Sequence, residues 1–147
     1  MNLDTYFPYQ LASTAEAFSQ KLTEVYGRDY GLSREEWRLL LLLADAKELT
    51  SLELARRTTL DKVQVSRAAR KLDDKGFITR SVSDTDKRLK VYACTDSGYR
   101  LFAQLFPKVQ NQAATVLDLL DKEERESLER GLMALKKAVQ RHSAATD

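Results

Sequence analysis

The chain has 147 residues, with 24 Lys and Arg against 22 Asp and Glu, one cysteine and one histidine. This length predicts a single domain that can bury its own core. One cysteine excludes an internal disulfide framework and fits a reducing compartment. The longest aliphatic run, Leu39–Leu43, is too short to span a bilayer, and the first ten residues lack a signal-peptide pattern. We therefore expect a cytoplasmic protein without a membrane partner.

Four capping boxes predict where helices begin, because each pairs a Ser, Thr or Asp with a Glu or Gln three residues later. They start at Ser33, Thr50, Asp61 and Asp121. Together with the apolar periodicity they predict six helices, at about 7–28, 34–46, 51–58, 62–75, 96–120 and 122–141. Only residues 58–60 separate the third and fourth helices, which is the short turn of a helix-turn-helix.

The segment after the fourth helix predicts a β-hairpin. Gly76 stands where that helix needs a left-handed cap, and residues 77–83 and 88–94 then alternate apolar and polar side chains. A helix sized for the DNA major groove, followed by a hairpin with a polar tip, is the order of elements in a winged helix-turn-helix. The expected fold is mainly α, with a small β-hairpin wing.

Charge is concentrated in the same part of the chain. Residues 56–90 hold eleven Lys and Arg against five Asp, a local net charge of +6, although the whole chain carries only +2. A basic centre between acidic flanks is typical of one DNA-facing surface. The alternative for any basic run is a solvated face.

The predicted fourth helix offers the candidate base-reading residues. If Val65, Ala68, Ala69 and Leu72 face inward, the opposite face carries short polar groups and guanidinium groups. Side chains near the start of such a helix reach base edges, and those further along contact phosphate. The candidates for base edges are Lys62, Val63, Gln64 and Arg67, and those for backbone contact are Ser66, Arg70 and Lys71. Ordinary surface salt bridges are expected for Asp73, Asp74 and Lys75.

The polar tip of the hairpin, residues 83–88, offers a second contact. An arginine on a narrow hairpin can enter the minor groove. Aspartates in such a loop make more sense as groups that cap the turn or hold Lys87 and Arg88 in place. For Asp84 alone, a plain polar turn is the favoured interpretation.

These motifs resemble the MarR family of bacterial transcriptional regulators. The segments that carry the resemblance are YGLSREEWRLLLLLAD, LTSLELARRTTLDKVQVSRAARKLDDKGFITR, and DTDKR followed by LKVYACTDSGYRLF. The resemblance implies a homodimer on a pseudo-palindromic double-stranded DNA site, with residues 1–31 and 96–147 as dimerisation helices and 32–95 as the DNA-binding region. It also implies that Arg88 is the wing arginine, that Asp86 orients it, and that Lys62, Gln64, Ser66 and Arg67 lie in the groove-reading segment.

Apolar side chains also suggest a partner subunit. Stripes in the first and sixth helices could be ordinary core, but the apolar residues of 96–120 spread around too much of the helix for one neighbour. We expect a homodimer.

Enzymatic functions find little support. His142 is the only histidine and lies in a tail expected to fray, so neither a catalytic triad nor a metal cluster can be built, and no cofactor is expected. Cys94 fits a small, half-buried residue of the second wing strand.

Relatives in the resembled family bind small aromatic acids, and the candidate residues for such an effector here are Tyr9, Tyr26, Trp37 and Arg38. Core packing of Trp37 and a surface role for Arg38 are the alternatives. The sequence thus predicts a DNA-binding regulator, most simply a repressor. An activator fits equally well, and a winged-helix protein-interaction module without a DNA target is the other candidate.

Overall fold

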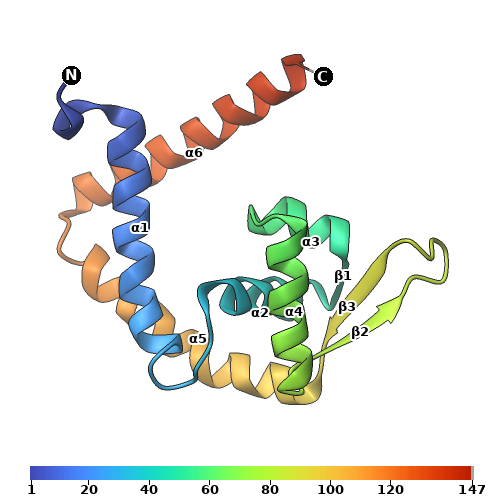
Figure 1. Ribbon diagram of the computed structural model, residues 1–147. Coiled ribbons are helices and arrows are strands. Elements are labelled where there is room, and N and C mark those ends of the chain that lie inside the picture. Colours follow the sequence, from blue (N-terminus) through green and yellow to red (C-terminus); the bar gives the residue numbers. More distant parts are fainter. Residues whose placement is uncertain (147) are drawn as a thin grey trace. The chain divides into compact units, whose positions relative to one another are not determined.

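The structure is a computed structural model that describes residues 1–146. The chain divides into two compact units, one covering residues 1–112 and the other the residues from 113 onward. Each unit is described by itself below (Figure 1). The elements are η1 (Leu3–Thr5), α1 (Phe7–Tyr26), α2 (Arg34–Ala46), β1 (Glu48–Thr50), α3 (Ser51–Thr58), α4 (Lys62–Asp74), β2 (Ile78–Val82), β3 (Lys90–Cys94), α5 (Asp96–Leu117) and α6 (Lys122–Thr146).

The helices begin where the capping boxes predicted. At the start of α4, Asp61 Oδ1 accepts from the Gln64 amide at 2.8 Å, and Gln64 Oε1 accepts from the Asp61 amide at 3.1 Å. The boxes at Ser33 and Thr50 are also complete, and Asp121 and Glu124 make the same reciprocal pair before α6. Each box satisfies amides that the first helical turn leaves free.

The end of α4 is set by Gly76, whose φ of 81° lies in the left-handed region. The amide of Gly76 donates to Asp73 O, and the amide of Phe77 donates to Leu72 O, both at 2.9 Å. These bonds close the helix in a Schellman motif and direct the chain into β2, as the glycine predicted.

The sheet has three antiparallel strands in the order β1-β3-β2, one more than the predicted hairpin. In the hairpin Arg80 lies opposite Tyr92, and in the added strand Leu49 also lies opposite Tyr92. The strands are shorter than predicted, since β2 spans Ile78–Val82 and β3 spans Lys90–Cys94. The β2–β3 hairpin projects from the side of the first unit, beside α4 (Figure 1).

The core of the first unit lies under α4. The inner face of this helix, Val65, Ala68, Ala69 and Leu72, is buried as predicted. Its neighbours in the core include Leu39, Leu40 and Leu43 of α2, Leu54 of α3, Ile78 of β2 and Tyr92 of β3. Two alanines on the inner face let the helix backbone lie close to these side chains. Because this face is buried, the opposite face of α4 is the one that faces solvent.

A row of stacked rings joins α1, α2 and α5 within the first unit. Tyr26 stacks on Trp37 with ring centroids 5.5 Å apart, Trp37 on Phe102 at 5.8 Å, and Phe102 on Phe106 at 4.9 Å. Nearby, Arg34 donates to both carboxylate oxygens of Glu16 at 2.7 and 2.8 Å, which ties the start of α2 to α1. Aromatic pairs of this kind add to the stabilisation that burial alone provides.

Three helix ends differ from the prediction by more than one residue. α1 ends at Tyr26 and α5 ends at Leu117. After α5 the backbone forms hydrogen bonds to the third residue back, because the Leu119 amide donates to Val116 O and the Leu120 amide donates to Leu117 O. The expectation that the C-terminal tail frays was wrong, because α6 continues to Thr146 and includes His142. No helix within residues 1–146 is both long and apolar enough to cross a membrane.

Candidate nucleic-acid interface

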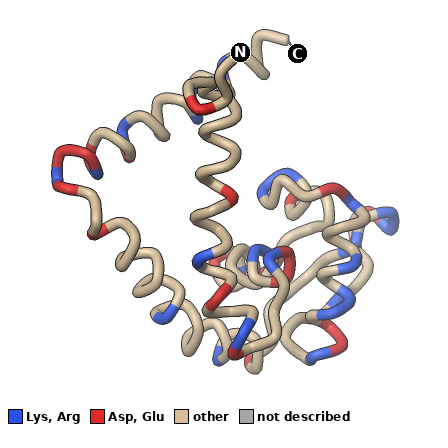
Figure 2. The backbone as a smooth tube through the Cα atoms, turned by 60° about the vertical axis from the view of Figure 1, so that its left-hand side comes forward, with Lys and Arg blue, Asp and Glu red and all other residues tan. Residues whose placement is uncertain are grey.

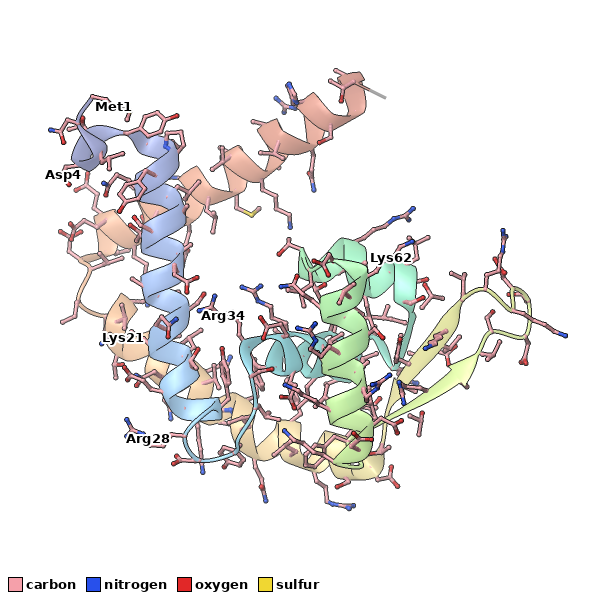
Figure 3. The ribbon with its side chains drawn as sticks, in the orientation of Figure 1. Met1, Asp4, Lys21, Arg28, Arg34 and Lys62 are labelled. Atoms are coloured by element: carbon pink, nitrogen blue, oxygen red, sulfur yellow. The ribbon has the colours of Figure 1, made fainter. Side chains whose placement is uncertain are left out.

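The outward face of α4 carries cations and one apolar side chain. Lys62, Arg67, Arg70 and Lys71 are exposed, and Val63 is 62% exposed. Val63, Arg67 and Arg70 are spaced four and three residues apart, so they form one stripe opposite the buried face. Lys62, labelled in Figure 3, marks the first turn of this helix. The structure therefore presents the predicted outward residues together, on a rigid element.

Gln64 is placed differently from the other candidates. It is half-buried, and its side-chain oxygen accepts the hydrogen bond from the Asp61 amide that completes the capping box. A bidentate contact with adenine needs both the oxygen and the nitrogen of the carboxamide. The capping bond already occupies one of the two lone pairs of this oxygen and holds the side chain towards Asp61, so Gln64 is less free to turn towards an adenine than an unbonded glutamine would be.

At the wing tip, one carboxylate holds one arginine. Arg88 donates from Nε to Asp86 Oδ1 at 3.1 Å and from Nη2 to Asp86 Oδ2 at 3.2 Å, and its own amide also donates to Oδ1 at 3.0 Å. These bonds lower the pKa of Asp86, the guanidinium being the larger cause, so the carboxylate stays ionised. The Asp86 amide in turn donates to Ser83 Oγ at 3.3 Å. The loop thus fixes Asp86, and Asp86 fixes Arg88.

A groove of about 260 Å³ separates the start of α4 from the wing. Three of the predicted DNA-binding residues, Lys62, Ser66 and Arg88, line it. The other lining residues are Ser51, Leu52, Val65, Leu89, Lys90 and Tyr92. In Figure 2 the lysines and arginines gather over this winged part of the first unit. The first turn of α3 and Lys90 were not predicted to belong to the site, and the fold places them in the lining of the groove. In the sequence, only the charge of Lys90 pointed to such a role.

Two ion pairs hold the far end of α4. Arg80 of β2 donates to Asp73 at 2.9 Å, and Lys75 donates to the buried carboxylate of Glu36 at 2.7 Å and to Gly31 O at 3.1 Å. Glu36 also accepts from the Ser33 amide, so both of its oxygens have partners. The Asp73 pair confirms the predicted surface salt bridge, whereas Lys75 pairs with a buried carboxylate and not with a surface one. Their partners could not be found from sequence spacing, because they lie on other elements.

The four effector candidates do not form one cluster. Tyr26 and Trp37 are buried in the ring stack, while Tyr9 is exposed and Arg38 half-buried. Tyr9 and Tyr26 lie seventeen residues apart on α1, which separates them by about 25 Å along the helix axis. One small ligand could not contact both tyrosines of the same α1.

Cys94 is half-buried at the end of β3, as predicted. Burial raises the pKa of its thiol to about 11. The thiol is therefore protonated at neutral pH, and a protonated thiol is a poor nucleophile.

A basic helix with a cationic hairpin beside it defines a winged helix-turn-helix DNA-binding protein. The sequence model of the MarR family matches residues 30–89, which run from the last residues before α2 to the wing tip. Over these residues the chain is similar to the MarR family, and the curated relatives that it matches are transcriptional regulators.

Individual relatives agree with this family. The chain is 29% identical over 113 residues to the HTH-type transcriptional repressor YetL of Bacillus subtilis, with 74% of this chain and 68% of that protein covered. Sco3205, a MarR family regulator from Streptomyces coelicolor solved in complex with DNA, matches with a TM-score of 0.79 and 24% identity over 88% of this chain and 86% of that one. NadR in complex with 4-hydroxyphenylacetate matches with a TM-score of 0.73 and 19% identity over 89% and 92%.

Proposed function

We propose that this protein is a homodimeric repressor that binds a pseudo-palindromic DNA site through α4 and the wing. In each subunit, α4 enters the major groove and the wing arginine enters the adjacent minor groove. The bound dimer covers a promoter and so blocks transcription. The repressor YetL and the DNA complex of Sco3205 support this assignment by similarity.

The observation that carries the proposal is the arrangement of the exposed cations. Lys62, Arg67 and Arg70 stand on the outward face of α4, and Arg88 is held on the wing across the groove from the start of the same helix. A rigid helix that places cations at its first turns matches the way helix-turn-helix proteins enter the major groove. Lys62 and Arg67 would read base edges, while Ser66, Arg70, Lys71 and Lys87 would contact the backbone.

Exposed apolar residues support the homodimer. In α6, Leu128, Leu132, Met133 and Val139 are each more than half exposed. In α1, the exposed apolar side chains include Phe7, at 62%, and Leu11, at 39%. Exposed apolar side chains along a helix are typical of an interaction site, and a second copy of the chain is the partner that a two-fold DNA site requires.

DNA binding can be tested with a fragment of the upstream DNA of the protein's own gene, in gel shifts at two salt concentrations. Because cations release counterions from phosphate, the affinity should fall steeply between about 50 and about 200 mM salt. Binding that is absent, or that does not respond to salt, would contradict the proposal and favour a protein-interaction module.

The proposal includes release of DNA by a small aromatic acid. The complex of NadR with 4-hydroxyphenylacetate supports this ligand class by similarity. Arg38 is the cation among the effector candidates that could pair the carboxylate. Aromatic acids should be titrated into the protein–DNA complex, and Arg38→Ala should blunt any release. If none of them changes the affinity for DNA, this part of the proposal fails.

A further inference from the structure

The first turn of α4 exposes an apolar residue among cations. Val63 is 62% exposed, and it stands between Lys62 and the arginines of the same helix. Valine is a poor choice for this position on local grounds, because its branched side chain lowers helix propensity and nothing is gained by leaving it in water. The core does not need it, since the buried face of α4 is complete without Val63.

The position of Val63 on the helix is the most outward one. The buried residues Val65 and Leu72 lie two and nine positions further along, which places them close to the opposite side of a helix with 3.6 residues per turn. The outward stripe runs through Val63, Arg67 and Arg70 and reaches Asp74 at its end. An aspartate would be repelled by phosphate, so the half of the stripe that begins at Val63 is the half suited to DNA.

One apolar group is available on the floor of the major groove, namely the C5 methyl group of thymine. We infer that Val63 contacts a thymine methyl group in each half-site, and so selects for a T·A pair at that position. This inference rests on the proposed DNA binding and extends it from general affinity to one base. Gln64, the next residue, is polar and half-buried, so it is less suited to contact a methyl group than the exposed Val63.

The neighbour of Val63 on the stripe sharpens the inference. Arg67 lies four residues further on, about 6 Å along the helix, a distance that spans about two base pairs of DNA. Arginine contacts guanine bidentately through O6 and N7. Each half-site should therefore carry its Val63-contacted thymine within about two base pairs of a guanine contacted by Arg67.

The test begins with duplexes that the full-length protein selects from a random pool. In the preferred duplex, each thymine is replaced in turn by deoxyuridine, which lacks only the C5 methyl group and still pairs with adenine. Affinities of the wild type and of Val63→Ala are then measured by fluorescence anisotropy. Because Val63 is exposed in α4, its replacement by alanine should leave the fold intact.

We expect one thymine per half-site at which deoxyuridine weakens wild-type binding by about fourfold, the effect of losing one buried methyl group. The same replacement should leave the affinity of Val63→Ala unchanged. Val82→Ala serves as the matched control, because Val82 is an equally exposed valine, at 58%, on the wing. That variant should keep the sensitivity to deoxyuridine, since thymine methyl groups are not displayed in the minor groove.

The inference is overturned if no thymine responds to deoxyuridine, or if the response persists in Val63→Ala. A protein that selects no duplex at all, and whose binding is insensitive to salt, would instead overturn the proposed function and this inference with it. The two failures are therefore distinguishable.

Discussion

The guanidinium of Arg88 is bonded to both carboxylate oxygens of Asp86, at 3.1 and 3.2 Å, while 90% of the Arg88 side chain remains exposed. An exposed salt bridge adds little to the stability of the fold. We therefore assign this pair the role of orienting the Arg88 side chain. The wing holds its arginine in one direction before any DNA is present. Less side-chain entropy is then lost on binding than with a free arginine.

We predict that Asp86→Ala weakens DNA binding although it removes a negative charge from a DNA-facing loop. The expected loss is about fivefold, from one lost orienting interaction of about 1 kcal/mol. Asp84→Ala is the matched control, because it removes the same charge from the same loop, and it should bind as well as the wild type or slightly better. Fluorescence anisotropy on one duplex measures both variants. Tighter binding by Asp86→Ala would show that charge, and not orientation, decides.

Arg67→Ala and Lys71→Ala should have different effects on the sequence preference of DNA binding. Arg67 belongs to the outward stripe near the start of α4, so its loss should cost about 1–3 kcal/mol and relax the sequence preference. Lys71 lies further along, and its loss should weaken all sequences alike. Affinities for the preferred duplex and for a scrambled duplex separate the two effects. An Arg67→Ala variant with unchanged affinity and specificity would refute the assigned role.

Gly98→Ala should destabilise the protein. A Cβ at Gly98 would lie 2.1 Å from the carbonyl oxygen of Phe77 and 2.7 Å from Cys94 Sγ, so the start of α5 would have to move away from β2 and β3. We expect a loss of about 2 kcal/mol or more in the free energy of unfolding, as for other overpacked sites. Gly131→Ala in α6 is the control, since a Cβ there meets nothing within 4 Å. It should stabilise α6 by up to about 1 kcal/mol. Urea denaturation of both variants checks the pair.

The pairing of Glu16 with Arg34 predicts an acid-dependent part of stability. The hydrogen bonds from Arg34 are the main reason that the pKa of Glu16 falls from 4.5 to about 2. Because the pKa is lower in the folded state, the stabilisation is complete above about pH 4.5 and is lost as the pH falls towards 2. Thermal unfolding of the wild type and of Glu16→Gln should therefore show a difference in Tm that disappears over this range. A difference that does not depend on pH would contradict the assignment.

Local signals in the sequence predicted most of the winged region. The reciprocal pairs at Ser33, Thr50 and Asp61 are contained within four residues each, so they could be found from spacing alone. The inner face of α4 followed from helical periodicity in the same way. Gly76 predicted the end of α4, because few other residues adopt its backbone angles without strain.

Non-local features were not predictable in this way. β1 has only three residues, too few for a periodic pattern, and it is defined by pairing with β3, more than forty residues later in the chain. The sequence predicted that Gln64 belongs to a capping box. How far the bond from the Asp61 amide restricts the Gln64 side chain in reading a base depends on the geometry of that bond in the structure. Lys75 and Glu36 are 39 positions apart, and no spacing rule connects them. The division into dimerisation and DNA-binding segments stays a prediction.

The central claim is that two winged units bind one duplex, and hydroxyl-radical footprinting of the selected duplex tests it most directly. We predict two symmetric protected clusters about one helical turn apart, each flanked by a minor-groove protection that disappears in Arg88→Ala. A single asymmetric cluster, or a pattern that Arg88→Ala leaves unchanged, would contradict the account.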